Sequence, residues 1–151
     1  MPRVFIQLLG TPQIEYEGEP FRFSGRKPLA LLAYLATTRS AHKRDSLATM
    51  FWPESDQSSA RHSLREALRN INRLGDGVLT KADRETVVLG QASHVWVDVD
   101  QFRKLLETCS THGHEPERVC GDCVSPLIQA LSLYRGRFMD GFTLDDSLEF
   151  D

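Results

Sequence analysis

The stretch SARHSLREALRNINRLG, residues 59–75, repeats its apolar side chains at three- and four-residue steps. This spacing is typical of a helix with one buried face, which would comprise Ala60, Leu64, Ala67, Leu68 and Ile71. Asp56 is a predicted N-cap, and Leu74-Gly75 is a predicted stop signal. We therefore predict a helix over residues 56–74.

The opposite face of this helix is basic. At about 100° per residue, five polar side chains lie away from the apolar stripe: Ser58, His62, Arg65, Arg69 and Arg73. Like charges four residues apart on a helix repel by about 0.2–0.5 kcal/mol, and only Glu66 interrupts the row. Because most basic helix faces are simply solvated, the row has to be interpreted from the elements around it.

The residues before this helix predict a small antiparallel sheet and two more helices. Short segments at 3–9, 13–17 and 21–24 are predicted strands, separated by turn residues. Helices are predicted over 26–38 and, ended by Trp52-Pro53, over 43–52. Their core-facing side chains are predicted to be Leu29, Leu32, Ala33, Leu35, Leu47, Met50 and Phe51.

The residues after it predict a hairpin. The segments VLTKAD and ETVVLG, at 78–83 and 85–90, alternate as hairpin strands do, and the tip carries Lys81, Asp83 and Arg84. The short segment 94–97 is one more predicted strand.

The last third of the chain predicts helices. Asp98-x-x-Gln101 resembles a capping box that opens a helix ending near Cys109. The apolar face of that helix is predicted to comprise Val99, Phe102, Leu105 and Leu106. After a polar loop at 110–123, the spacing of Leu127, Leu131 and Tyr134 predicts another helix, which ends near Gly136.

Charge is unevenly distributed along this acidic chain. Its 151 residues carry a net charge of −3 at pH 7. Residues 1–97 hold 13 Lys+Arg against 10 Asp+Glu, whereas residues 98–151 hold 5 against 11. The segment 26–73 alone holds 9 basic and 4 acidic residues. Because the local field steers a charged partner, the global charge does not exclude a polyanion.

The sequence also bears on the compartment. No apolar run approaches the ~20 residues that span a bilayer. The amino-terminal stretch MPRVFIQLLG lacks the apolar core and the cleavage site of a signal peptide. We expect a cytoplasmic protein without a membrane partner.

Three helices followed by a hairpin are the arrangement of a winged helix, in which the third helix enters the major groove of DNA and the hairpin reaches the backbone. Facing phosphates would relieve the repulsion within the arginine row. On this interpretation Arg65 and Arg69 reach base edges, Ser58 and His62 reach base edges or phosphates, and Arg73, Lys81 and Arg84 contact phosphate. Arg26 and Lys27, at the first helix, are lesser phosphate candidates.

Several blocks of the chain also carry a family resemblance. VFIQLLGTPQIEYEGEP, SGRKPLALLAYLA, LATMFWPESDQSSARHSLREALRNINR, VWVDVDQF and LYRGRFMDGFTLDDSLEF resemble bacterial transcriptional activators of the SARP/AfsR type. The resemblance implies an α+β fold: an OmpR-like winged helix-turn-helix with a leading four-stranded sheet, then a helical, tetratricopeptide-like bacterial transcriptional activation domain.

The resemblance also assigns roles to the segments. It implies a DNA-binding domain at 1–97, with the recognition helix at 56–74 and the wing at 78–89, and a truncated activation domain at 98–151. Lys43 stands where such proteins often have Ser or Thr as a cap, and Glu66 lies near the presumed DNA face. Glu66 would repel phosphate or accept a hydrogen bond from cytosine N4.

The expected function is sequence-specific binding of double-stranded DNA to regulate transcription, as an activator. The expected partners are repeated DNA half-sites, bound cooperatively by a monomer or weak dimer, and RNA polymerase. The alternative is a protein-interaction module whose basic face docks an acidic partner.

A cluster of metal-ligand residue types lies at 109–123. Cys109, His114, Cys120 and Cys123 are the predicted ligands of a structural zinc ion, with His112 as the substitute for His114. The alternative is three reduced thiols and two solvated histidines. The surroundings lack the βαβ context of a thioredoxin-like CxxC motif.

No motif indicates catalysis. The sequence has no glycine-rich phosphate loop and no nucleophile elbow. Asp98 and Asp100 are explained by a helix start. We therefore expect a protein that is not an enzyme and needs no cofactor for its activity.

Overall fold

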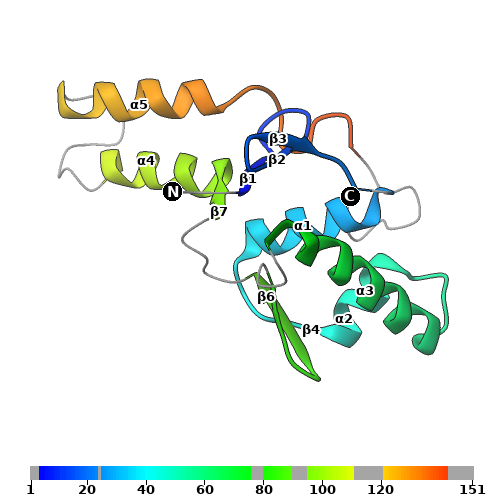
Figure 1. Ribbon diagram of the computed structural model, residues 1–151. Coiled ribbons are helices and arrows are strands. Elements are labelled where there is room, and N and C mark those ends of the chain that lie inside the picture. The colour runs from blue at the N-terminus through cyan, green and yellow to red at the C-terminus, as the bar shows by residue number, and fades with distance from the viewer. Residues whose placement is uncertain (1–3, 24, 76–79, 90–94, 111–120, 143–151) are drawn as a thin grey trace.

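The computed structural model describes residues 4–23, 25–75, 80–89, 95–110 and 121–142, and it has the predicted α+β architecture (Figure 1). The strands are β1 (Val4–Gln7), β2 (Gln13–Tyr16), β3 (Glu19–Phe21), β4 (His42–Lys43), β5 (Thr80–Ala82), β6 (Thr86–Leu89) and β7 (Val95–Val97). The helices are α1 (Lys27–Thr38), α2 (Arg44–Phe51), α3 (Gln57–Asn72), a 3-10 turn (Arg73–Gly75), α4 (Asp98–Ser110) and α5 (Gly121–Leu133).

The amino-terminal sheet has four strands in the order β3-β2-β1-β7. The first three form an antiparallel meander, as predicted. The fourth strand follows the hairpin in the chain rather than leading the fold: β7 pairs with β1 in parallel, with Val4 opposite Val95 and Ile6 opposite Val97. The leading sheet is thus completed by residues some 90 positions downstream.

The third strand differs from the prediction of residues 21–24. Glu17 and Gly18, both at positive φ (53° and 84°), form a two-residue turn, which starts β3 at Glu19. Positive φ at both central residues matches the twist of the flanking strands. Pro20 lies in β3 because this strand is at the sheet edge, where a missing N–H breaks no ladder.

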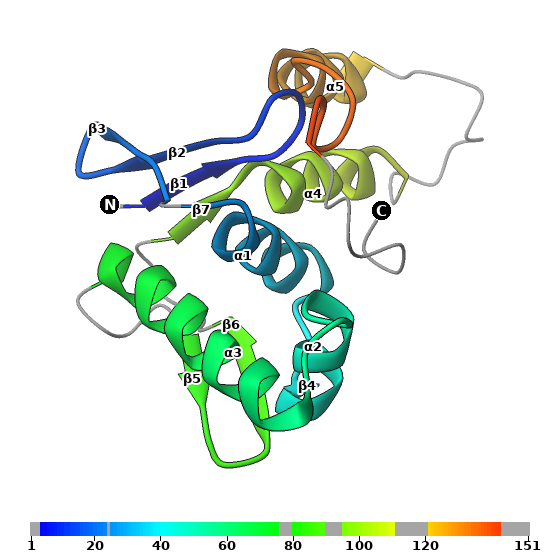
Figure 2. The same cartoon turned by 90° about the vertical axis from the view of Figure 1, so that its right-hand side faces the viewer.

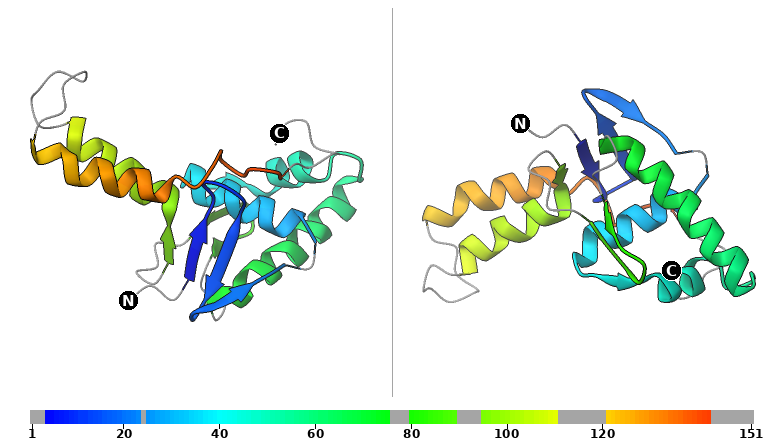
Figure 3. Two further views of the ribbon diagram at one scale, coloured as in Figure 1. Left: turned by 90° about the horizontal axis from the view of Figure 1, so that it is seen from above. Right: turned by 60° about the horizontal axis from the view of Figure 1, so that its bottom comes forward.

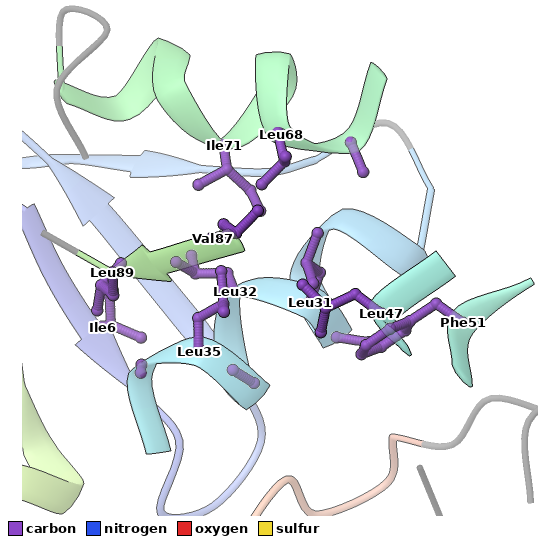
Figure 4. Packing of buried hydrophobic residues seen from close by; sticks show 14 of the residues in the cluster. Ile6, Leu31, Leu32, Leu35, Leu47, Phe51, Leu68, Ile71, Val87 and Leu89 are labelled. Atoms are coloured by element: carbon purple, nitrogen blue, oxygen red, sulfur yellow. The ribbon is translucent and has the colours of Figure 1, made fainter. Parts of the chain in front are cut away.

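The helix α1 lies between this sheet and α3 (Figure 2). Figure 4 shows the core between them, where side chains of α1, α2 and α3 meet those of the sheet and of β6. Leu32, Leu35, Phe51, Ile71 and Val87 are fully buried there. The helices α1, α2 and α3 confirm the predicted positions: α1 ends where predicted, and the other helix ends lie one or two residues inside the predicted bounds.

The wing is a three-stranded sheet in the order β4-β6-β5. The hairpin of β5 and β6 confirms the prediction over the described residues. The two-residue strand β4 was not predicted: it pairs with β6 through His42 opposite Val87 and Lys43 opposite Thr86. The start of α2 is therefore fastened to the wing.

The helices α4 and α5 form a hairpin that projects to one side (Figures 1 and 3). The Asp98 side chain does not close a capping box of the predicted kind. It is buried, and its carboxylate accepts hydrogen bonds from the backbone N–H groups of Leu8 and Leu9, each at 2.9 Å. These two donors lie just beyond the last residue of β1, and Asp98 satisfies them and ties α4 to the sheet.

The predicted apolar faces of these two helices are partly wrong. Val99 is buried, but Leu106 is 41% exposed, Leu131 72% and Tyr134 51%. In α5 the buried side chains are instead Cys123 and Ala130. The helix begins at Gly121, so the predicted loop 110–123 ends earlier than expected.

Residues 135–142 return to the end of β1. The Gly10 N–H donates to the Arg137 carbonyl at 2.9 Å, and the Met139 N–H donates to the Leu8 carbonyl at 2.8 Å. Val97 ends β7 and Asp98 begins α4 with no residue between them. The start of α4 and residues 135–142 are therefore packed on the winged helix, and the division into two domains at this point stays a prediction.

Candidate nucleic-acid interface

The helix α3 presents the basic row as predicted. Asp56 is its N-cap, and the Asp56 carboxylate accepts a hydrogen bond from the Ser59 N–H at 2.7 Å. This hydrogen bond lowers the pKa of Asp56 below its usual value. All five predicted apolar residues are buried, and the predicted polar residues Ser58, His62, Arg65, Arg69 and Arg73 are exposed.

Two hollows lie along α3 where it faces the wing and the start of α2. The first has a volume of about 750 Å³ and is lined by Lys43, Arg44, Asp45, Ser58, Arg61, Leu64, Arg65, Arg84 and Glu85. The second has a volume of about 760 Å³ and is lined by Arg44, Arg65, Leu68, Arg69, Asn72, Arg73 and Ala82.

Arg44 and Arg65 line both hollows, so the two are adjacent, and we call their combined lining the basic groove. Seven basic residues line the basic groove against two acidic ones, Asp45 and Glu85. The groove thus concentrates positive charge between a helix and a hairpin, at the end of the molecule away from α5 (Figure 2). Such a surface suits a polyanion.

Ion pairs moderate the repulsion along α3. Arg61 pairs with Asp45 of α2 (Nε to Oδ1, 2.8 Å), and Arg69 pairs with Glu66 (3.1 Å). The hydrogen bond from Arg61 lowers the pKa of Asp45, and Asp45 raises the pKa of Arg61. Both pairs are largely exposed, so each contributes little to stability. Glu66 is therefore a partner of Arg69 within the row.

Arg65 and Arg73 have no acidic partner within ion-pair distance among the residues that the structure describes, and the same holds for Arg84. These guanidinium groups carry their full charge into the groove or to its rim. The relief of their repulsion by an external anion is the chemistry that the groove offers.

The turn of the wing, residues 83–86, is held by Asp83. Its carboxylate accepts hydrogen bonds from the N–H groups of Glu85 (2.8 Å) and Thr86 (2.7 Å). The hydrogen bond from the Thr86 N–H, followed by that from the Glu85 N–H, lowers the pKa of Asp83. The turn exposes Arg84 beside the first hollow. Lys81 is exposed on β5 but lines neither hollow.

Arg26 and Lys27, the lesser phosphate candidates, lie at the start of α1 and line neither hollow. The Lys27 ammonium donates to the carbonyl of Phe51 and lies 5.4 Å from the centre of the Trp52 ring. The Arg26 guanidinium lies 5.6 Å from the centre of the Phe142 ring. Both cations thus have contacts within the protein.

Three groove residues were missed by sequence reasoning: Lys43, Arg44 and Arg61. Arg61 is one position before His62, and its direction toward α2 depends on where Asp45 lies. Lys43 and Arg44 join the groove because β4 pairs with the wing. The sequence signal that could have indicated them is the pair of adjacent basic residues, Lys43 and Arg44, at the start of a predicted helix.

The predicted zinc ligands Cys109, His112, His114 and Cys120 have side chains outside the described residues. Cys123 is described: it lies in the first turn of α5 and is fully buried. The zinc site therefore stays a prediction. Within the described residues, no helix combines the length and the apolar character that crossing a membrane requires.

The chain is similar to a known protein in its fold. No protein-family model matches the chain, and no curated protein matches it by sequence. The structure is similar to that of EmbR from Mycobacterium tuberculosis, solved in complex with a low affinity phosphopeptide, with a TM-score of 0.70 and 24% sequence identity. The match covers 93% of this chain and 38% of the EmbR chain. It supports the predicted winged-helix architecture.

Proposed function

We propose that this protein binds double-stranded DNA in the basic groove and regulates transcription. The observation that carries the proposal is the convergence of seven basic side chains, from α2, α3, the 3-10 turn after it and the wing, on two adjacent hollows. In this arrangement α3 enters the major groove while the wing follows the adjacent backbone. The fold-level likeness to EmbR supports the architecture that the family resemblance implied.

The proposal assigns different tasks to the basic residues. Arg65 lies where the two hollows join, so it is placed to form bidentate hydrogen bonds to guanine O6 and N7. Arg73 and Arg84, toward the ends of the groove, contact phosphate. The groove is proposed to bind rather than to catalyse.

The test is the salt dependence of binding to duplex DNA. With about five phosphate contacts, log K against log salt has an expected slope of roughly −4 to −5. Sites selected from random duplexes then give the operator. No duplex binding by the folded protein at about 50 mM salt would overturn the proposal and favour an acidic protein partner.

A matched control removes the same charge elsewhere. Arg65→Ala with Arg73→Ala is compared with Lys104→Ala with Arg137→Ala, because Lys104 and Arg137 are exposed and outside the groove. Only the first pair is expected to weaken binding strongly. Equal effects would show that net charge, not the groove, decides the affinity.

The activator role adds two expectations. The protein occupies repeated half-sites cooperatively, and a DNA-bound protomer contacts RNA polymerase. Binding to one and to two selected half-sites checks the first expectation, and transcription from a template with those sites checks the second. An isolated half-site bound as tightly per protomer as a pair would contradict cooperativity.

A further inference from the structure

The side chain of Arg44 connects the start of α2 with the turn of the wing. Its Nε donates a hydrogen bond to the carbonyl of Asp83 at 2.7 Å. Its backbone N–H donates to the carbonyl of Glu85, also at 2.7 Å. One residue therefore binds the turn on both sides of Arg84.

The rest of the attachment between α2 and the wing is short. The strand β4 has two residues, and the register gives it two opposite positions on β6. The turn itself is closed by the Asp83 carboxylate, which holds the N–H groups of Glu85 and Thr86. The turn is thus a preformed unit that Arg44 joins to α2 by two hydrogen bonds. At the other end of the wing, the N–H and the hydroxyl of Thr80 donate to the Asn72 side chain of α3 at 3.0 and 2.8 Å.

The same side chain faces the proposed DNA site. Arg44 is one of the two residues that line both hollows of the basic groove. A guanidinium has five N–H donors in a planar fork, and the bond to Asp83 uses one of them. A lysine in its place would keep the charge but lose the planar fork, of which Nε is one arm.

We propose that Arg44 is a positioning residue for DNA recognition: it fixes the wing relative to α3, so that Arg84 meets the DNA backbone while Arg65 meets the bases. The inference rests on the proposed function of the groove. It predicts that the contribution of Arg84 depends on Arg44, although the two side chains belong to different elements.

The test is a double-mutant cycle of Arg44→Lys and Arg84→Ala, measured as affinity for the selected duplex. In the native background Arg84→Ala is expected to lower the affinity about 5-fold and the salt slope by about 1. With Arg44→Lys it is expected to lower the affinity less than about 2-fold, because coupled residues are not additive. A loss of stability alone would not change the salt slope in this background-dependent way.

Arg61→Lys is the matched control. Arg61 lines the same groove and is held by Asp45, not by the wing. Its effect and that of Arg84→Ala are expected to multiply. If Arg44→Lys also multiplies with Arg84→Ala, or binds as the native protein does, Arg44 acts as a charge alone and the inference is overturned.

A second measurement needs no DNA. Residual dipolar couplings of the backbone N–H groups of residues 83–86 report the orientation of the wing relative to α3. In Arg44→Gln these couplings are expected to shrink or change, whereas those of α3 stay. Unchanged couplings overturn the inference even if the native protein binds DNA. Changed couplings with no duplex binding by the native protein support the positioning and overturn the proposed function.

Discussion

The helices α3 and α5 differ in how far their apolar side chains are buried. Each of the five apolar positions predicted for α3 is buried, and its outer face is polar and basic. In α5 the exposed face carries Val124, Ile128 and Leu131, which are 46%, 60% and 72% exposed. The difference follows from the neighbours: α3 packs on α1, α2 and β5, whereas α5 packs mainly on α4.

The comparison shows that an apolar residue in a helix is buried only where another element covers it. The α5 sequence is apolar or uncharged almost all around, so its spacing does not select one face. The α3 sequence has polar residues at every position that faces away from the core. Exposed apolar side chains at 4-3 spacing form a surface suited to contact with another apolar surface.

The largest expected difference is in unfolding free energy, between Ile→Ala substitutions in the two helices. Ile71→Ala in α3 is expected to cost about 2–5 kcal/mol of unfolding free energy, because it leaves a cavity in the core. Ile128→Ala in α5 is expected to stay within about 0.5 kcal/mol, because the side chain is already exposed to solvent. Urea unfolding of both variants measures this. Equal costs would mean that the outer face of α5 is covered in solution.

The next effect tests the hydrogen bonds of Asp98, which join α4 to the amino-terminal sheet. Asp98→Ala leaves the N–H groups of Leu8 and Leu9 without their acceptor, at an expected cost of about 1–3 kcal/mol. Asp98→Asn keeps one acceptor oxygen and should cost less. Asp100→Ala is the control, since its pair with Arg39 is partly exposed and contributes about 1 kcal/mol or less. Calorimetry that ranks Asp100→Ala above Asp98→Ala would contradict the assignment.

The third prediction concerns binding by α3. Arg65→Ala and Arg69→Ala are each expected to lose about 1–3 kcal/mol of specific binding and to relax the base preference at one position. Arg73→Ala and Arg84→Ala should weaken all sequences alike. Titration of the selected site and of a scrambled duplex separates the two classes. Native affinity in both Arg65→Ala and Arg69→Ala would show that the wrong face was assigned.

A more local change is expected for α4 and α5. If Cys109, His114, Cys120 and Cys123 hold zinc, chelation loosens these helices while the winged helix stays folded and binds DNA, because its core does not depend on the metal. If these residues hold zinc, metal analysis of protein purified without chelator is expected to find one zinc per chain. Well under one zinc, with three titratable thiols, would show that the cysteines are simply reduced.

The smallest expected effect is the loss of the α3 cap in acid. The folded pKa of Asp56 lies below its usual value of 3.8. The stabilisation of α3 by the Asp56 carboxylate is therefore complete above pH 3.8, and it is lost as the pH falls through the folded pKa. The amide shift of Ser59 should follow this titration. A midpoint above pH 3.8 would mean that the cap is not formed.

Local sequence signals determined the helices and much of the core. The spacing in residues 59–75, the cap at Asp56 and the break at Trp52-Pro53 act within a few residues, so the structure confirms them. The meander followed from alternation and turn residues, although the two-residue turn at Glu17-Gly18 moved β3 forward.

Only the tertiary structure decided the contacts between distant segments. The parallel pairing of β7 with β1, the role of Asp98, the pairing of β4 with the wing and the entry of Arg44 and Arg61 into the groove all join residues far apart in the chain. Side-chain spacing reports which face of an element is apolar, but not which element will cover it. Leu131 is exposed and Ala130 is buried, although they are adjacent residues of one helix, because α5 packs mainly on α4.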